Sequence, residues 1–136
     1  MIRQIPVGER WIAADRAQAW GYPRPIAPRE VETGYWFEDG RAICWFVTPL
    51  PDGPENMLAV HAIGDPEARR RVPIGDPRTM VAVEVIAELL GAHRLYSLIP
   101  REMVGGPMPI RAMRRYLRAR GWAEDDLGCY KQLAEG

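Results

Sequence analysis

The amino-acid sequence predicts a mixed α/β fold in which an antiparallel meander is followed by helix crossovers, so that helices flank a central mixed sheet. Short runs rich in β-branched and aromatic residues alternate with amphipathic stretches at helical spacing. Two of these runs are joined by Asp-Gly, a dipeptide typical of tight hairpins. With 136 residues, 47% of them hydrophobic, the chain is large enough for one core, so we expect one domain over residues 1–136.

The first half of the chain predicts a helix followed by a hairpin. Trp11, Ala14 and either Gln18 or Ala17 fall near one face of the helical stretch, which Gly21 ends. Three prolines in "GYPRPIAPRE" predict an extended connection, because proline lacks the backbone N–H that a helix interior needs. Asp39-Gly40 accepts the positive φ angles of a type I′ turn. The expected elements are a short strand over 2–6, a helix over 8–20, an extended connection over 21–30, and hairpin strands over 34–38 and 41–47.

The second half predicts strands that alternate with helices. Asp76-Pro77 is a good helix start, since Asp caps free N–H groups and Pro is tolerated at the first helical position. Helical spacing puts five apolar residues on one broad face of this helix: Val83, Val85, Ile86, Leu89 and Leu90. The last helix is amphipathic, with apolar residues on one side and a stripe of arginines on the other. The expected elements are a strand over 57–63, a helix from 77 to Gly91, a strand over 93–99, a helix over 109–120 and a last strand over 129–133.

Charge and cysteine content exclude several classes of protein. Eighteen basic residues balance eighteen acidic ones, so the chain has no net charge that would attract nucleic acid or a membrane surface. Cys44 and Cys129 are far apart and have no metal-ligand spacing, so we expect neither a metal site nor a disulfide. No apolar run approaches the length of a membrane span. We therefore expect a cytoplasmic protein.

One arginine-rich stretch, "PEARRRVPIGDPR" at residues 66–78, lies between a strand and a helix, where many enzymes bind phosphate. Pro66, Glu67 and Arg69 stand in the register of the P-E-x-R-G-x-G-x-G/A loop of the GNAT superfamily of N-acetyltransferases. Further along, "ELLGAHRLYSLIP", "MRRYLRARGW" and "CYKQL" follow in the order of that family's helix-to-strand step, Gly-aromatic pair and last strand. Over roughly residues 30–135 the chain therefore resembles a small, divergent GNAT protein of the kind found in phage genomes.

The resemblance implies acetyl-CoA as cofactor, extended where the strands 57–63 and 93–99 splay apart. The residues it implies for the cofactor are Ala62 and Ile63 along the pantetheine arm, and Arg69, Arg70, Arg71 and Gly75 at the phosphates. The loop departs from the family pattern, because Arg70, Arg71, Val72 and Pro73 stand where glycines are usual. A side chain keeps the backbone away from a phosphate, and proline has no N–H to donate. The stretch predicts either a modified anion site or a solvated basic loop.

Three residues are candidates for catalysis under this resemblance. His61 is the candidate general base, since an ordinary imidazole titrates near neutral pH, but it also fits a hydrogen-bonded core residue. Glu38, at the hairpin tip, is a second candidate base. Many GNAT enzymes place an acidic Tyr four residues before the last helix's Gly, and here that position is Leu117. Tyr116 lies one position earlier, about 100° around the helix, so it is either a displaced acid or a core residue.

Two functions follow from these features. The first is transfer of an acyl group from acetyl-CoA to an amine acceptor. The second is a binding or structural module without catalysis, such as a virion-associated or accessory phage protein with a protein partner. The retained Pro66-Glu67-x-Arg69 start favours the enzyme, and the altered loop favours the module.

Overall fold

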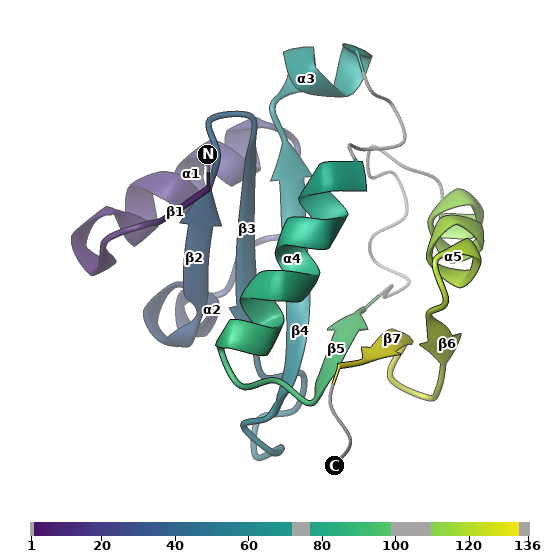
Figure 1. Cartoon of the computed structure of the whole chain (residues 1–136). Helices are drawn as coiled ribbons and strands as arrows, with labels where there is room; N and C mark the ends of the chain where they lie inside the picture. The colour runs from purple at the N-terminus through teal and green to yellow at the C-terminus, as the bar shows by residue number, and fades with distance from the viewer. Residues whose placement is uncertain (1, 72–76, 99–109, 134–136) are drawn as a thin grey trace.

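The computed structural model describes residues 2–71, 77–98 and 110–133, whose strands form a seven-stranded sheet of order β1-β2-β3-β4-β5-β7-β6 (Figure 1). Neighbouring strands are antiparallel except β4 and β5, which run parallel, so the predicted mixed α/β class is confirmed. The strands are β1 (Arg3–Gln4), β2 (Tyr35–Glu38), β3 (Ala42–Val47), β4 (Met57–Gly64), β5 (Arg94–Ser97), β6 (Ala123–Glu124) and β7 (Cys129–Gln132). The helices are the 3₁₀ turn η1 (Val7–Glu9), α1 (Arg10–Ala19), α2 (Pro28–Thr33), α3 (Pro66–Arg71), α4 (Pro77–Leu89) and α5 (Ile110–Ala119).

The hairpin at Asp39-Gly40 forms as predicted, but its turn is not of type I′, because Gly40 has a positive φ and neither Asp39 nor Arg41 has one. Gly40 has a φ of 84°, a conformation that costs glycine little, and the Asp39 carboxylate accepts the N–H groups of Arg41 and Ala42 at 2.9 and 2.8 Å. The register that follows pairs Glu38 with Ile43 and alternates side chains between the two faces of the sheet.

Two helices lie where the sequence predicted none. The connection expected over 21–30 is extended only up to Ala27, because α2 begins at Pro28, whose missing N–H is no loss in a first turn. The Glu30 carboxylate reaches back to the N–H of Ala27 at 3.2 Å and closes that turn. The arginine-rich stretch begins as α3, with Asp65 accepting the N–H of Glu67 at 2.8 Å, and not as a loop.

Helices cover both faces of the sheet (Figure 1). On one face α1 and α2 bury the alanines of α1 against Trp36, Trp45 and Ile63. On the other, α4 and α5 bury Val83 and Leu117 against side chains from the opposite sides of the same strands. Among the described residues no helix is long and apolar enough to cross a membrane.

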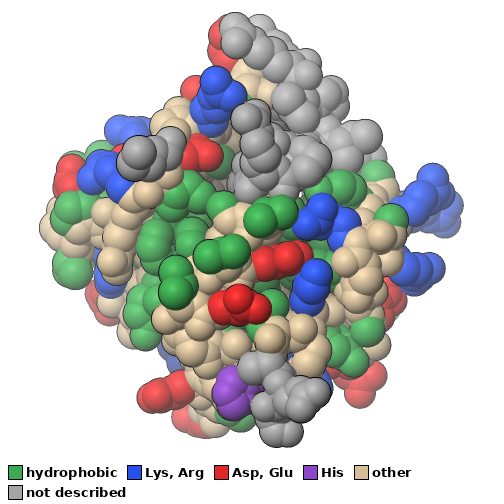
Figure 2. All heavy atoms as spheres, in the orientation of Figure 1, with side chains coloured by type: hydrophobic (Ala, Val, Ile, Leu, Met, Phe, Trp, Pro, Cys, Tyr) green, Lys and Arg blue, Asp and Glu red, His purple; other side chains and the backbone are tan. Residues whose placement is uncertain are grey.

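The buried face of α4 is narrower than its periodicity suggested. Val83 is buried, but Val85 is 48% exposed and Leu89 is 82% exposed. With Val81 they form an apolar stripe on the outer side of α4, and Figure 2 shows hydrophobic side chains on this face of the molecule. Trp11, predicted on the core face of α1, is likewise half-exposed, because the small Ala13, Ala14 and Ala17 make the close contact with the sheet.

Candidate functional site

The candidate site lies where β4 continues beyond the end of β5. β4 pairs with β5 only over Met57–Ala59, the last pair being Ala59 with Tyr96. On its other side β3 pairs with β4 up to Gly64. Within the part of the chain that the structure describes, residues 60–64 therefore have no β5 residue opposite them (Figure 1). Backbone N–H and C=O groups need partners, so this edge suits an extended ligand that pairs with a strand.

Ala62 and Ile63, predicted along the pantetheine arm, lie in this unpaired part of β4. Ile63 points into the core under α1 and α2 and is 3% exposed, whereas Ala62 is exposed. Their backbone is held straight by the pairs Ala62–Cys44 and Ile63–Ile43 with β3. The structure thus brings both residues to the place that their predicted function requires, and the function itself stays a prediction.

The predicted phosphate-binding residues follow directly at the end of β4. The backbone of Arg69, Arg70 and Arg71 forms the last turn of α3. Gly75 falls within residues 72–76, outside the described residues. The arginine-rich segment therefore starts between the carboxyl end of β4 and the amino end of α4, while its anion binding stays a prediction.

His61 lies in the unpaired part of β4, on the face covered by α1 and α2, and is 6% exposed. Its Nδ1 is 2.8 Å from the Tyr22 hydroxyl and 3.5 Å from Arg24, and its ring stacks on Trp45 with centroids 5.6 Å apart. Burial and the positive charge of Arg24 lower the pKa of His61 to about 4, although Glu30 acts in the opposite direction. A histidine with such a pKa is a weak base at neutral pH, so this environment weighs against the general-base prediction, which stays open.

A buried polar network supports His61 from the α1–α2 connection. Arg24 forms a forked ion pair with Glu30 at 2.6 and 3.0 Å, and the indole N–H of Trp45 donates to Glu30 at 2.8 Å. Burial would raise the pKa of Glu30, but hydrogen bonds from Arg24, Trp45 and the Ala27 N–H outweigh it and lower the pKa to about 2. The sequence does not predict this network, because its proline-rich segment has the local signature of a plain connection.

Glu38 does not approach His61. It sits at the end of β2, two strands away from β4, where its carboxylate pairs with Arg3 at 2.6 Å and with Arg16 at 3.7 Å. These pairs connect β2 to β1 and to α1. The carboxylate therefore has a structural use at the edge of the sheet, and its predicted catalytic function remains a prediction.

Tyr116 lies on the face of the sheet opposite to His61. It packs at the margin of the core beneath α4 and α5, and the Arg120 guanidinium is 5.9 Å from its ring centroid. Leu117, at the position where the family has its acid, is 1% exposed. The structure thus keeps Tyr116 and His61 on separate faces, and the acid function of Tyr116 stays a prediction.

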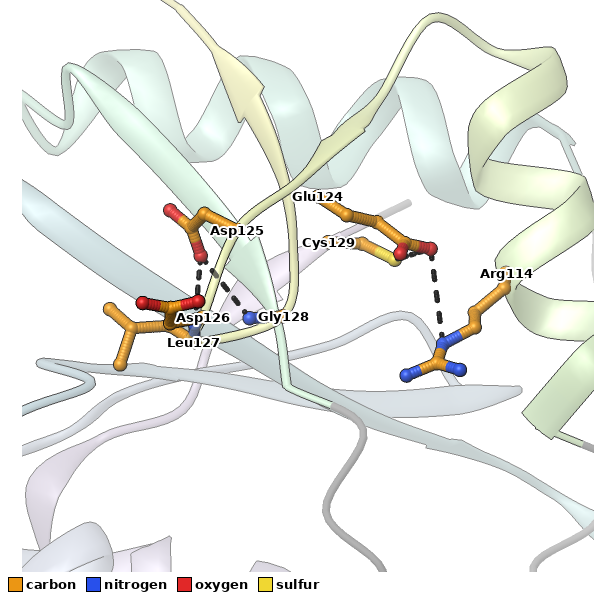
Figure 3. Close-up of a pocket in the computed structure, with 7 residues that line it drawn as sticks. All are labelled: Arg114, Glu124, Asp125, Asp126, Leu127, Gly128 and Cys129. Atoms are coloured by element: carbon orange, nitrogen blue, oxygen red, sulfur yellow. Dashed lines mark hydrogen bonds and ion pairs between the residues drawn. The ribbon is translucent and has the colours of Figure 1, made fainter.

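A small pocket of about 130 Å³ opens between α5 and the turn that joins β6 to β7 (Figure 3). Glu124 faces Arg114 across it at 3.8 Å, and it also pairs with Arg118, which does not line the pocket, at 3.4 Å. The Asp125 carboxylate accepts the N–H groups of Leu127 and Gly128 at 2.8 and 3.3 Å, and these bonds close the turn after β6. Among the described residues no three His, Cys, Asp or Glu side chains gather as a metal site would require.

Comparison with known proteins identifies relatives by fold only. No family model and no curated protein matches the chain. The structure is similar to yncA of Salmonella typhimurium, assigned as an acetyltransferase and solved with acetyl-CoA, with a TM-score of 0.63 and 13% identity over 100% of this chain and 95% of that one. It is also similar to a GNAT-family acetyltransferase of Staphylococcus aureus Mu50 (TM-score 0.57, 11% identity, 98% and 99% covered). Spermidine N-acetyltransferase of Vibrio cholerae gives a TM-score of 0.58 at 14% identity, with 98% and 93% covered. The chain therefore has the fold of the GNAT-family acetyltransferases.

Proposed function

We propose that this protein transfers an acetyl group from acetyl-CoA to an amine. The observation that carries the proposal is the end of the β4–β5 pairing at Ala59–Tyr96, after which the next five residues of β4 pair only with β3 among the residues that the structure describes. One solved protein of the same fold, yncA, contains acetyl-CoA. Fold alone does not establish an activity, so the proposal depends on whether this edge holds the cofactor.

The residues present fit an extended, anionic cofactor. The backbone of Ala62 and Ile63 would pair with the amide groups of the pantetheine arm, as a neighbouring strand would. Arg69, Arg70 and Arg71 follow immediately after β4, and arginine forms forked, charge-assisted bonds to phosphate. Bound acetyl-CoA supplies an activated acyl group, which the amine attacks. The chain's own contribution is to align the acyl group on β4 and to hold the phosphates.

A non-catalytic binding module is the second candidate, and α3 favours it. A helix directs backbone N–H groups along its own axis, so residues 66–71 cannot cradle a pyrophosphate as a glycine-rich loop does. The displacement of Tyr116 by one residue adds to this, since Leu117 stands at the position where the family has its acid. The two candidates differ in one measurable property, the affinity for acetyl-CoA.

Calorimetric titration of acetyl-CoA into the purified protein separates them. We expect micromolar binding, weakened roughly tenfold by Arg69→Ala or Arg71→Ala, the loss expected for one charge-assisted bond. Arg111→Ala is the matched control, because this exposed arginine of α5 lies outside the proposed site. Absence of heat at millimolar acetyl-CoA, with the protein folded by circular dichroism, would exclude the transferase and leave the binding module.

If acetyl-CoA binds, release of the free thiol identifies the acceptor. A panel of amines that includes polyamines, amino-acid α-amines and lysine side chains would be incubated with protein and acetyl-CoA. Thiol release above the hydrolysis background, with the acetylated amine seen by mass spectrometry, is the expected result. Binding without any acetylated amine across the panel would contradict the transferase.

A further inference from the structure

We propose that Tyr22 and Arg24 hold His61 as the Nε2–H tautomer, so that its ring is a hydrogen-bond donor and not a general base. The use of this donor by a substrate rests on the proposed acetyl transfer. The tautomer itself does not, because the free protein's geometry determines it.

Both polar neighbours of Nδ1 are placed to donate to it. The Tyr22 hydroxyl lies 2.8 Å from Nδ1 and Arg24 Nη2 lies 3.5 Å from it. A guanidinium can only donate, so a proton on Nδ1 would face the N–H groups of a cation. Nδ1 is therefore the acceptor, and the single proton of a neutral imidazole must be on Nε2.

The charges around His61 favour the neutral ring. Arg24, from the α1–α2 connection, and burial on β4 both lower the pKa of His61, whereas Glu30 of α2 raises it. Glu30 is itself neutralised by its forked bond to Arg24 and by the indole N–H of Trp45. Burial also raises the pKa of Tyr22 to about 12, so at neutral pH its hydroxyl keeps the proton that it donates.

The packing of the His61 ring hinders a flip that would exchange the positions of Nδ1 and Nε2. It stacks on Trp45 at 26° between planes, and Tyr22 packs edge-on against the same indole with centroids 4.8 Å apart. His61 could accept a proton only at Nδ1, which the Tyr22 hydroxyl already occupies. The Nε2–H is the remaining polar group of the ring, on a residue two positions beyond the last β4–β5 pair.

Nitrogen-15 NMR of histidine-labelled protein reads the tautomer directly. At pH 7 we expect the two nitrogens of His61 to differ, Nδ1 resonating as an unprotonated and Nε2 as a protonated ring nitrogen. His93, which contacts Asn56 through Nδ1, gives the other set of signals, and His93→Gln assigns the two sets. A proton on Nδ1, or a doubly protonated ring at pH 7, would overturn the proposal.

Tyr22→Phe tests the cause, because it removes the hydroxyl and keeps the ring against Trp45. We expect the two nitrogens of His61 to move toward a mixture of tautomers, while Tyr35→Phe, at a 43% exposed tyrosine of β2, leaves the spectrum unchanged. An unchanged spectrum in Tyr22→Phe would show that the hydroxyl does not hold the tautomer. If Tyr22→Phe does not fold, the spectrum of the unaltered protein still decides the tautomer.

Kinetics separate a donor from a base. If His61 is a donor, His61→Gln, which keeps an N–H donor, retains most of kcat/KM, and His61→Ala loses roughly tenfold. Neither variant then removes the acidic limb of the pH profile of kcat/KM. Loss of that limb in His61→Gln would show that His61 takes the proton and would overturn the proposal. Failure of acetyl-CoA to bind would instead reject the proposed function, without altering the NMR result.

Discussion

The two halves of the sheet are held together by different means. In the half formed by β1 to β4, buried aromatic rings pack across strands, with Trp36 and Trp45 stacked at 4.6 Å and 5° between planes. In the half formed by β5 to β7, the strands are two to four residues long and are joined by polar contacts near the surface. There the Tyr96 hydroxyl donates to Asp125 at 2.7 Å, and the Arg94 guanidinium lies 4.5 Å from the Tyr130 ring centroid.

This difference determines where the candidate site can form. β4 has eight residues and β5 has four, so a parallel pair between them must end early. β4 stays extended beyond that point because β3 pairs with it as far as Gly64. The β1–β4 half thus presents a strand edge that the described residues of β5 to β7 do not pair with. A ligand that pairs with this edge would not have to order it first.

The largest effect that tests this comparison is truncation of a buried side chain in each half. Trp45→Ala removes the Trp36 stack and leaves Glu30 without an indole donor, and we expect it to lower the free energy of unfolding by about 4–5 kcal/mol. Leu95→Ala, at a fully buried residue of β5, should cost about 2–4 kcal/mol. Urea unfolding followed by fluorescence and circular dichroism measures both.

Trp11→Ala is the control for that pair, since Trp11 is 50% exposed and should cost less than about 1 kcal/mol. A smaller loss in Trp45→Ala than in Leu95→Ala would show that the β1–β4 half is not the more tightly packed one.

Acid should weaken the β1–β4 half through His61 and then through Glu30. The pKa of His61 is lowered from 6.5 to about 4 in the folded protein, so its contribution is full above pH 6.5 and is lost as the pH falls toward 4. The pKa of Glu30 is lowered from 4.5 to about 2, so its contribution is full above pH 4.5 and is lost between pH 4.5 and 2. We expect each to contribute about 3 kcal/mol, at about 1.4 kcal/mol for each pKa unit.

Urea unfolding at a series of pH values measures this dependence. His61→Gln should flatten the curve between pH 6.5 and 4 and leave the lower range unchanged. Glu30→Gln should flatten the curve only below pH 4.5. An equal slope between pH 6.5 and 4 in the unaltered protein and in His61→Gln would contradict the assignment.

The parts of the fold that the sequence predicts are those with a local cause. Asp39-Gly40 forms its turn from its own φ preferences, and the helix that starts at Pro77 has both a start signal and a periodic apolar face. The helices α2 and α3 were missed because proline at the head of a helix has the same local signature as proline in a loop. Only the contacts that follow, such as Glu30 with the Ala27 N–H, distinguish the two.

The candidate site depends on contacts between distant parts of the chain. His61 could be placed on a strand from the sequence, but its partner Tyr22 is 39 residues away in a segment that has no periodicity. The point where the β4–β5 pairing ends, at Ala59 and Tyr96, likewise depends on how two strands that are distant in the sequence pair with each other. A signal that could have been used is the alternation of prolines with Tyr22, Arg24 and Glu30, since polar side chains on a stiff segment lose little entropy when they order.

The smallest effect concerns the turn between β6 and β7. The Tyr96 hydroxyl accepts from Arg94 at 3.3 Å and donates to Asp125, whose carboxylate holds the N–H groups of Leu127 and Gly128. Tyr96→Phe should lower the free energy of unfolding by about 1 kcal/mol and speed hydrogen exchange at those two amides, while Tyr35→Phe changes neither. Exchange that speeds equally in β2 and β3 would mean that the two halves open together. Exchange confined to the turn would show that the β5–β7 half moves independently of the strand edge where we place the cofactor.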